Sequence, residues 1–250
     1  MSRVSDDKNG TSLEDPRLGD LGAPVEVRRH PKARRLTLRV SRTRRAVIVT
    51  LPTQCDLGEA GSFVHRHIDW VKERLGNLPD PVPFAHRQVM PLRGTPHRIV
   101  FVQPQRGRGV VHMHKPTRGF KEIRVAVSDD NGPQRLRHWL FKQARKDLEA
   151  RVLLHAEHLR VRPKKVSVRD QTSRWGSCSS TGALSFSWRL VMAPPFVLDY
   201  VAAHEVAHLR EMNHGPRFWA LVDEAVPYMD EAKEWLQIYG MDLHRYGVSD

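Results

Sequence analysis

The segment from Pro194 to Trp219 constrains this chain most, because its composition predicts a helix that ends at a defined break. Two prolines open it, and no further proline or glycine occurs until Gly215-Pro216. The helix would carry His204, Glu205 and His208 in an HExxH pattern. Because residues four apart lie on one helical face, the two imidazoles can bind a single cation with Glu205 beside it. The segment therefore predicts a metal site.

The third ligand of such a site has two candidates. His214 stands just before the break, where a turn can bring its imidazole back over the metal. Glu211 is three residues after His208 on nearly the same face, but a ligand further along the helix would have to reach backwards. We favour His214. The alternative, in which His204 and His208 are buried core histidines, leaves His214 without a role.

The ligand set predicts the chemistry. Three neutral imidazoles around one Zn²⁺ per chain leave a fourth position open, and a water bound there has a pKa of about 7. Glu205 is adjacent to a ligand without being one, so it can take the proton of that water and pass it to the leaving group. We therefore expect a zinc-dependent hydrolase with Glu205 as its catalytic residue.

Charge and periodicity divide the 250 residues into three regions. Residues 1–24 are polar and without periodicity, which predicts a disordered lead-in. Residues 25–131 alternate at period two between Arg-rich turns, which predicts a basic, antiparallel β-rich region with one helix from Asp56 to Gly76. Residues 132–250 have helical periodicity, with a long helix over 133–159. The expected fold class is α+β, with a helix-rich catalytic core.

A longer run of residues carries a resemblance. Residues 174–219 contain a Trp-Gly-Ser-Cys loop, a D-Y-V lead-in to HExxH, and N-H-G-x-x-F-W after it. This run resembles the YgjP-like metallopeptidase family, which is related to the SprT-like and WLM zinc peptidases. The resemblance implies a zincin-like, minigluzincin-type core with zinc on His204, His208 and His214 and with Glu205 as general base. It also implies a sheet edge beside the HExxH helix, where an extended peptide could bind.

Other side chains of this run are candidates for the substrate cleft. Arg174, Ser177 and Tyr200 could orient substrate or stabilise an oxyanion. In the alternative, the loop is structural, and Gly176 supplies an unusual backbone angle. Cys178 has no activating base nearby in the sequence, so we expect a small buried residue there.

Composition limits the partners and the compartment. Residues 25–195 hold 34 basic and 13 acidic side chains, a net charge of +21, so non-specific association of nucleic acid with basic residues 28–45 is an open hypothesis. The sequence shows no signal peptide and no apolar span, and its two cysteines match no metal or redox spacing. We expect a cytoplasmic protein without a membrane segment.

A peptide or protein substrate is our first choice. One alternative is a metal-dependent hydrolase of nucleotides or of another phosphate-containing substrate, which would use the same water and the basic segment. Another is a basic nucleic-acid-associated protein whose zinc is structural.

Overall fold

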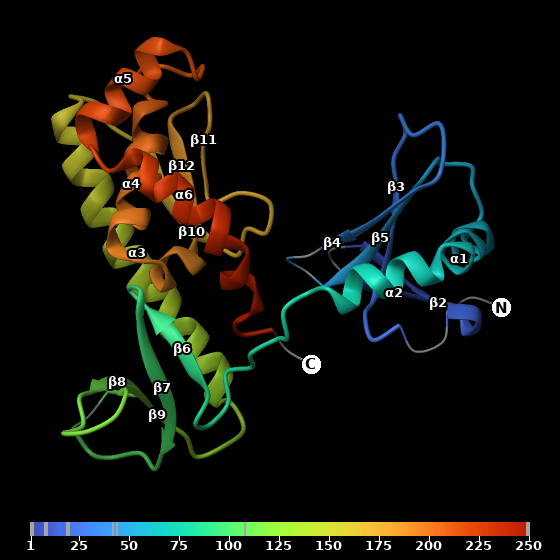
Figure 1. Ribbon diagram of the computed structural model, residues 1–250, viewed down its shortest axis with the longest axis horizontal. Coiled ribbons are helices and arrows are strands. Elements are labelled where there is room, and N and C mark those ends of the chain that lie inside the picture. Colours follow the sequence, from blue (N-terminus) through green and yellow to red (C-terminus); the bar gives the residue numbers. More distant parts are fainter. Residues whose placement is uncertain are drawn as a thin grey trace. The chain divides into compact units, whose positions relative to one another are not determined.

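The computed structural model describes residues 3–7, 10–18, 21–41, 43, 45–107 and 109–248. These residues form six α-helices, three 3₁₀ helices and three small mixed sheets (Figure 1). The chain divides into two compact units, Met1–Asp80 and Pro81–Asp250, each with its own apolar core.

The first unit contains a five-stranded sheet and two helices. The strands follow the order β1-β2-β3-β5-β4, with bounds β1 (Arg3–Asp7), β2 (Gly10–Glu14), β3 (Val25–Arg29), β4 (Thr37–Ser41) and β5 (Ala46–Leu51). The 3₁₀ helix η1 (Pro16–Leu18) follows β2, and the helices α1 (Leu57–Arg66) and α2 (Ile68–Gly76) follow β5.

The antiparallel sheet expected for this region is wrong in one respect, because β3 and β5 run parallel. The reason is the composition of β5, whose side chains are buried at every position except Thr50. Such a strand belongs in the middle of a sheet with both edges hydrogen-bonded. It therefore lies between β3 and β4, while the more exposed β4 takes the edge.

Two other expectations for the first unit also change. The lead-in expected to be disordered carries strands where it is described, with β2 paired to β3 and with Leu13 and Leu18 buried. Met1, Ser2 and the pairs at 8–9 and 19–20 lie outside the described residues. The helix expected from Asp56 to Gly76 is divided at His67, and Asp56 caps its start by accepting a hydrogen bond from the Gly58 amide at 3.0 Å.

The second unit contains two further mixed sheets and four helices. One sheet follows the order β6-β7-β9-β8, with β6 (Val89–Leu92), β7 (Thr95–Val102), β8 (Val111–His114) and β9 (Lys121–Ala126). The other follows the order β10-β12-β11, with β10 (Lys165–Arg169), β11 (Gly176–Cys178) and β12 (Ala183–Ser187). The helices are α3 (Gly132–His158), α4 (Pro195–Ala207), α5 (Pro216–Ala225) and α6 (Met229–Tyr239), with the 3₁₀ helices η2 (Trp188–Met192) and η3 (Gly240–Arg245).

Helix α3 holds the second unit together. The long helix expected over 133–159 is confirmed, and its apolar stripe, including Leu136 and Leu140, shares one core with Ile123 of β9 and Val197 of α4. The division expected after residue 131 therefore falls inside this unit. No helix among the described residues is long and apolar enough to span a membrane.

The tight turn between β6 and β7 positions the start of α4. Arg93 and Gly94 both have a left-handed backbone, with φ of 50° and 72°. Their amides donate to the carbonyls of Val191 at 2.7 Å and Met192 at 3.1 Å, immediately before Pro194. A Cβ at Gly94 would lie 3.0 Å from Pro194 Cα, so this contact requires glycine.

Candidate metal centre

Helix α4 is buried on nearly all sides. Pro195 occupies its first turn, where the missing amide is not needed, and the small side chains of Ala202, Ala203 and Ala207 are buried against the core. The helix ends at Ala207, and His208 is its C-cap residue, still with helical backbone angles. His204 and His208 therefore lie one turn apart at the end of a rigid element.

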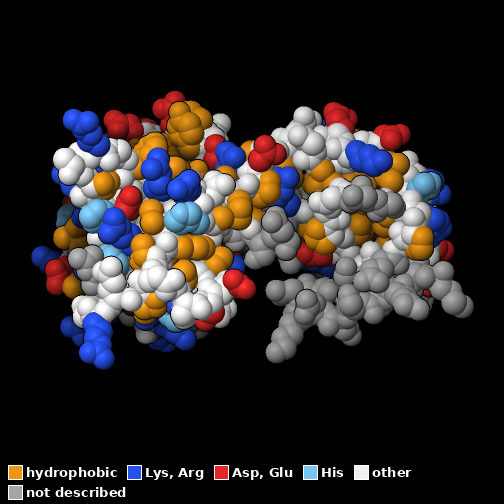
Figure 2. Space-filling view, turned by 90° about the horizontal axis from the view of Figure 1, so that it is seen from below, with side chains coloured by type: hydrophobic (Ala, Val, Ile, Leu, Met, Phe, Trp, Pro, Cys, Tyr) orange, Lys and Arg blue, Asp and Glu red, His pale blue; other side chains and the backbone are white. Residues whose placement is uncertain are grey.

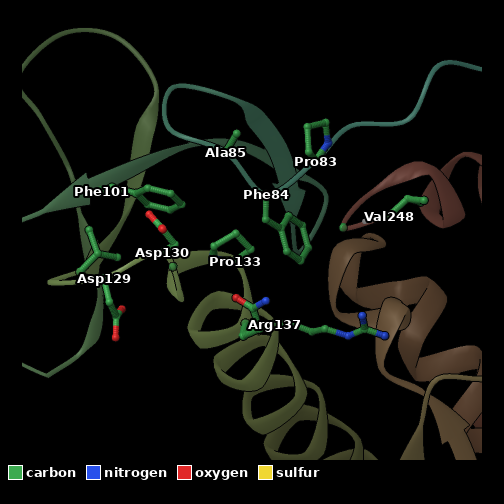
Figure 3. Close-up of a pocket in the computed structure, with 13 residues that line it drawn as sticks. Pro83, Phe84, Ala85, Phe101, Asp129, Asp130, Pro133, Arg137 and Val248 are labelled. Carbon is green, nitrogen blue, oxygen red and sulfur yellow. The ribbon is translucent and has the colours of Figure 1, made fainter. Parts of the chain in front are cut away.

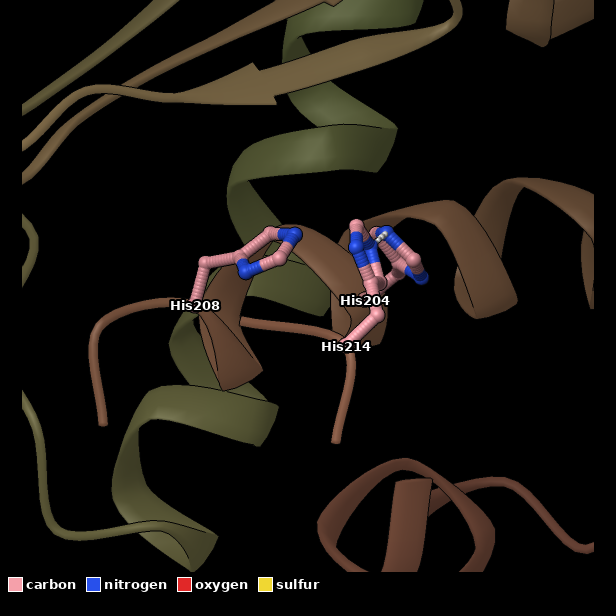
Figure 4. Close-up of side chains that lie close together, drawn as sticks. All are labelled: His204, His208 and His214. Carbon is pink, nitrogen blue, oxygen red and sulfur yellow. Dashed lines mark hydrogen bonds between the residues drawn. The ribbon is translucent and has the colours of Figure 1, made fainter. Parts of the chain in front are cut away.

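Three imidazoles meet at this helix end. One nitrogen from each of His204, His208 and His214 lies within 4.8 Å of the others, and the Nε2 atoms of His204 and His214 are 3.1 Å apart (Figure 4). The chain turns after His208, and α5 begins at Pro216, so His214 comes from the connecting segment as its spacing predicted. Among the described residues, no other group of His, Cys, Asp and Glu side chains converges in this way.

Neighbouring groups fix the orientation of the imidazoles. His208 Nδ1 donates to the backbone carbonyl of Glu211 at 3.1 Å, which leaves its Nε2 as the acceptor. The buried ring of Phe218 stacks on His208 with centroids 4.5 Å apart and meets His204 edge-on at 4.9 Å. Phe218 is thus a wall of the cluster as well as a contact between α5 and α4.

The cluster favours neutral imidazoles. Burial, and after it the neighbouring His208, His214 and Lys233, together lower the pKa of His204 to about 4. Burial also lowers the pKa of His208. At neutral pH both rings therefore keep the lone pair that a metal needs.

This donor set fits a first-row divalent metal. Three imidazole nitrogens suit zinc, and two nitrogens each about 2.1 Å from one tetrahedral zinc would lie about 3.4 Å apart. The 3.1 Å between the Nε2 atoms of His204 and His214 is close to that separation.

Glu205 lies buried against β11. Its side chain is 6% exposed, and burial raises its pKa to about 7, an effect that the charge of Arg174 opposes. A Cβ at Gly176 would lie 2.6 Å from Glu205 Oε1, so the strand approaches this carboxylate more closely than any other residue would allow. The expected unusual backbone angle at Gly176 is wrong, since its φ is not left-handed, and the requirement is steric.

The remaining sequence candidates lie at different depths. Tyr200 is buried, its ring meets His204 edge-on at 5.9 Å, and burial raises its pKa to about 12. Ser177 lies in β11 opposite Ser185 of β12, and Arg174 is exposed just before β11. Cys178 is half-buried in β11 rather than buried, because this strand is an edge.

Sequence reasoning missed a buried polar cluster behind the histidines. Asp199 of α4 accepts hydrogen bonds from His155 Nε2 of α3 at 2.8 Å and from the hydroxyl of Tyr228, and Arg151 lies 3.6 Å away. Burial alone would raise the pKa of Asp199, but the hydrogen bonds from His155 and Tyr228 lower it overall. These partners are distant in sequence, so no spacing pattern could reveal them.

A separate cavity of about 500 Å³ lies in the second unit, lined by Phe84, Phe101, Pro133 and Arg137 among others (Figure 3). Neither Glu205 nor any of the three histidines lines it. Its lining combines aromatic rings with Asp129 and Asp130 and contains no cluster of metal ligands.

The basic residues of the first unit are only partly described, since Arg42 and Arg44 lie outside the described residues. Arg29 donates to the carbonyls of Thr53 and Cys55, and Arg45 to that of Pro79. On the face shown in Figure 2, Lys and Arg side chains are interspersed with acidic and hydrophobic ones. Nucleic-acid association through residues 28–45 stays a prediction.

Three converging histidines, with a buried glutamate next to one of them in the chain, fit a metal-dependent hydrolase. The sequence model of the YgjP-like metallopeptidase domain matches residues 34–239, and the chain belongs to this family of metallopeptidases. The resemblance found in the sequence is thus confirmed.

Among solved structures, the chain is similar to the crystal structure of the metallopeptidase zymogen of Pyrococcus abyssi abylysin. The two are 22% identical over 40% of this chain and 99% of that chain, with a TM-score of 0.34, too low to carry an argument about the fold. The comparison with curated proteins found no match.

Proposed function

We propose that this protein is a zinc-dependent metallopeptidase in which His204, His208 and His214 hold one zinc ion per chain and Glu205 is the general base. The observation that carries the proposal is the convergence of the three histidines, together with the burial of Glu205, which follows His204 in the chain and has the β11 backbone against its carboxylate. A zinc ion held there would act as a Lewis acid and would lower the pKa of water to about 7.

Glu205 is suited to proton transfer because burial weakens its preference for the charged form. In the proposed reaction its carboxylate takes a proton from the water that attacks the peptide carbonyl. The same carboxyl group then gives this proton to the departing amine nitrogen. The close approach of Gly176 restricts where the carboxylate can lie.

The β11 edge is the proposed substrate-binding strand. Among the strands that the structure describes, β11 pairs only with β12, and we propose that an extended peptide forms main-chain hydrogen bonds with its other edge. Ser177 lies on this strand, and Arg174 precedes it. Arg174 and Tyr200, which both precede Glu205 in the sequence, are our candidates for stabilising the oxyanion.

Cytoplasm remains the compartment that we propose. In support, Cys55 and Cys178 are free thiols rather than a disulfide.

A digest of a peptide library tests this function. Wild-type protein with about one zinc per chain, measured by elemental analysis, should cleave peptide bonds. Glu205→Gln should keep the zinc and lose at least about 100-fold in rate, within the range for general acid–base catalysis. Full activity of Glu205→Gln, or protein without zinc after metal-replete expression, would refute the proposal.

A further inference from the structure

Lys233 of α6 lies at the aromatic wall of the histidine cluster. Its Nζ is 4.2 Å from the ring centroid of Trp219, a cation–π contact. The ring of Trp219 is in turn 5.8 Å from that of His204 and 5.6 Å from that of His214. These distances place the ammonium group within about 10 Å of the His214 ring.

The ammonium group of Lys233 can still bind a ligand. It forms one ion pair, with Asp230 Oδ1 at 3.2 Å, and the side chain of Asp230 is 88% exposed. Such a surface pair is weak and uses one of the three N–H donors. The side chain of Lys233 is itself 36% exposed, so it is accessible.

Lys233 is a positively charged residue in a part of the chain that is mostly negatively charged. Residues 196–250 contain ten acidic and only four basic side chains, and one of these four, Lys233, lies on the wall of the cluster. A second cation, Arg174, is exposed just before β11, the strand that contacts Glu205, and it has no hydrogen bond or ion pair with another described residue. Cations therefore flank both the histidines and the glutamate.

We propose that Lys233, held on Trp219, binds a carboxylate of the substrate and makes this site selective for anionic peptides. The inference rests on the proposed peptidase function. Trp219 reduces the freedom of the lysine side chain before binding, so less conformational entropy is lost when a carboxylate is bound. Arg174 offers a second positive group on the β11 side.

The carboxylate could belong to an acidic side chain or to the peptide's C-terminus. Four matched peptides distinguish these sources. Two have Glu next to the scissile bond and two have Gln there, and one of each pair has a free C-terminus and the other an amidated one. Preference for Glu identifies the side chain, whereas preference for the free C-terminus, whatever the neighbour, identifies the terminal carboxylate.

The first measurement is kcat/KM for these peptides with the zinc-loaded full chain. We expect wild type to favour the anionic peptide about 10-fold, which corresponds to about 1.4 kcal/mol. Lys233→Met, which keeps an apolar stem for Trp219, should bring the ratio close to 1, and Lys233→Arg should restore it. Lys146→Met replaces an exposed lysine of α3 and should leave the ratio unchanged.

The second measurement is the affinity of the same labelled peptides for zinc-loaded Glu205→Gln, with and without Lys233→Met, by fluorescence anisotropy. Preferential binding without cleavage by wild type would support the anionic site and refute the peptidase. Cleavage without discrimination between charged and neutral peptides would overturn the inference and leave the peptidase standing. A preference that survives Lys233→Met would also overturn it.

Discussion

Gly176 and Glu205 are in such close contact that we expect the glycine to be required for activity. A Cβ at this position would lie 2.6 Å from both Cγ and Oε1 of Glu205, a separation that real Cβ atoms do not show. We predict that Gly176→Ala displaces the carboxylate and lowers kcat/KM about 100-fold, the cost of misplacing a catalytic group by about 1 Å. Zinc content should stay at the wild-type level, because the histidines are not touched.

Gly76→Ala is the matched control for this substitution, since a Cβ there meets nothing within 4 Å. Its activity should equal that of wild type. If Gly176→Ala were as active as the control, the contact with Glu205 would be irrelevant to catalysis.

His214 and Glu211, the two candidates for the third metal ligand, present different atoms to the histidine cluster. His214 contributes an imidazole nitrogen, whereas Glu211 contributes only its backbone carbonyl, which accepts from His208. We predict that His214→Ala lowers zinc affinity by more than about 100-fold, which exceeds the usual effect of losing a residue that only hydrogen-bonds to a metal ligand. Glu211→Ala should change the zinc affinity little. Competition with a chromophoric chelator measures both affinities. The reverse order would assign the third position to Glu211.

The sequence reveals residues of the site where spacing along one element places them together. His204 and His208 are one helical turn apart, and His214 follows at a break. The sequence pattern was therefore enough to predict that these three histidines lie together. The contact of Gly176 with Glu205 joins a strand to a helix, and Asp199 joins α4 to α3. Such contacts depend on how the elements pack, which no local pattern encodes.

At the scale of elements, η3 supports the loop before β11. Arg189 donates to the carbonyls of Leu243 at 3.0 Å and Tyr246 at 2.7 Å, and His244 packs on Trp175 with ring centroids 5.1 Å apart. Trp175 immediately precedes β11. The packing of η3 against Trp175 therefore supports the position of β11, the strand that contacts Glu205.

This packing should be sensitive to acid. Burial, and after it the nearby Arg189, together lower the pKa of His244 to about 4, while an unfolded histidine titrates near 6.5. The unfolded chain thus binds a proton that the folded chain does not, and the free energy of unfolding falls as the pH drops from about 6.5 to 4. The loss is on the order of 3 kcal/mol.

Urea unfolding of metal-free protein at pH 7 and pH 5 measures the part of this loss that falls between these pH values, about 2 kcal/mol. We predict a smaller difference between the two pH values for His244→Gln than for wild type, because the amide does not titrate. An equal difference in both proteins would show that other groups cause the acid sensitivity.

Helices were easier to predict than sheets for a physical reason. The stripe of α3 repeats every four residues and is visible in the chain, and so is the Asp56 cap of α1. The parallel pairs β3–β5, β7–β9 and β10–β12 join strands that another strand or loop separates. Their alternating pattern fixes which face is buried but not which neighbour a strand takes.

At the scale of the whole molecule, the chain has two separate apolar cores. Leu51 and Val64 belong to the core of the first unit, and Leu140 and Phe218 to that of the second, which also carries the histidine cluster. A ligand that binds only the folded second unit should stabilise that unit alone, by about 2.7 kcal/mol at 100 times its dissociation constant.

We therefore predict two calorimetric transitions, of which only one moves to higher temperature when zinc is added. Leu51→Ala and Leu140→Ala are a matched pair of fully buried leucines, and each should cost about 2–5 kcal/mol. Leu51→Ala should lower the transition that zinc does not move, and Leu140→Ala the one that it does. If calorimetry gave a single transition, and both substitutions and zinc shifted it, the two units would instead unfold as a single cooperative structure.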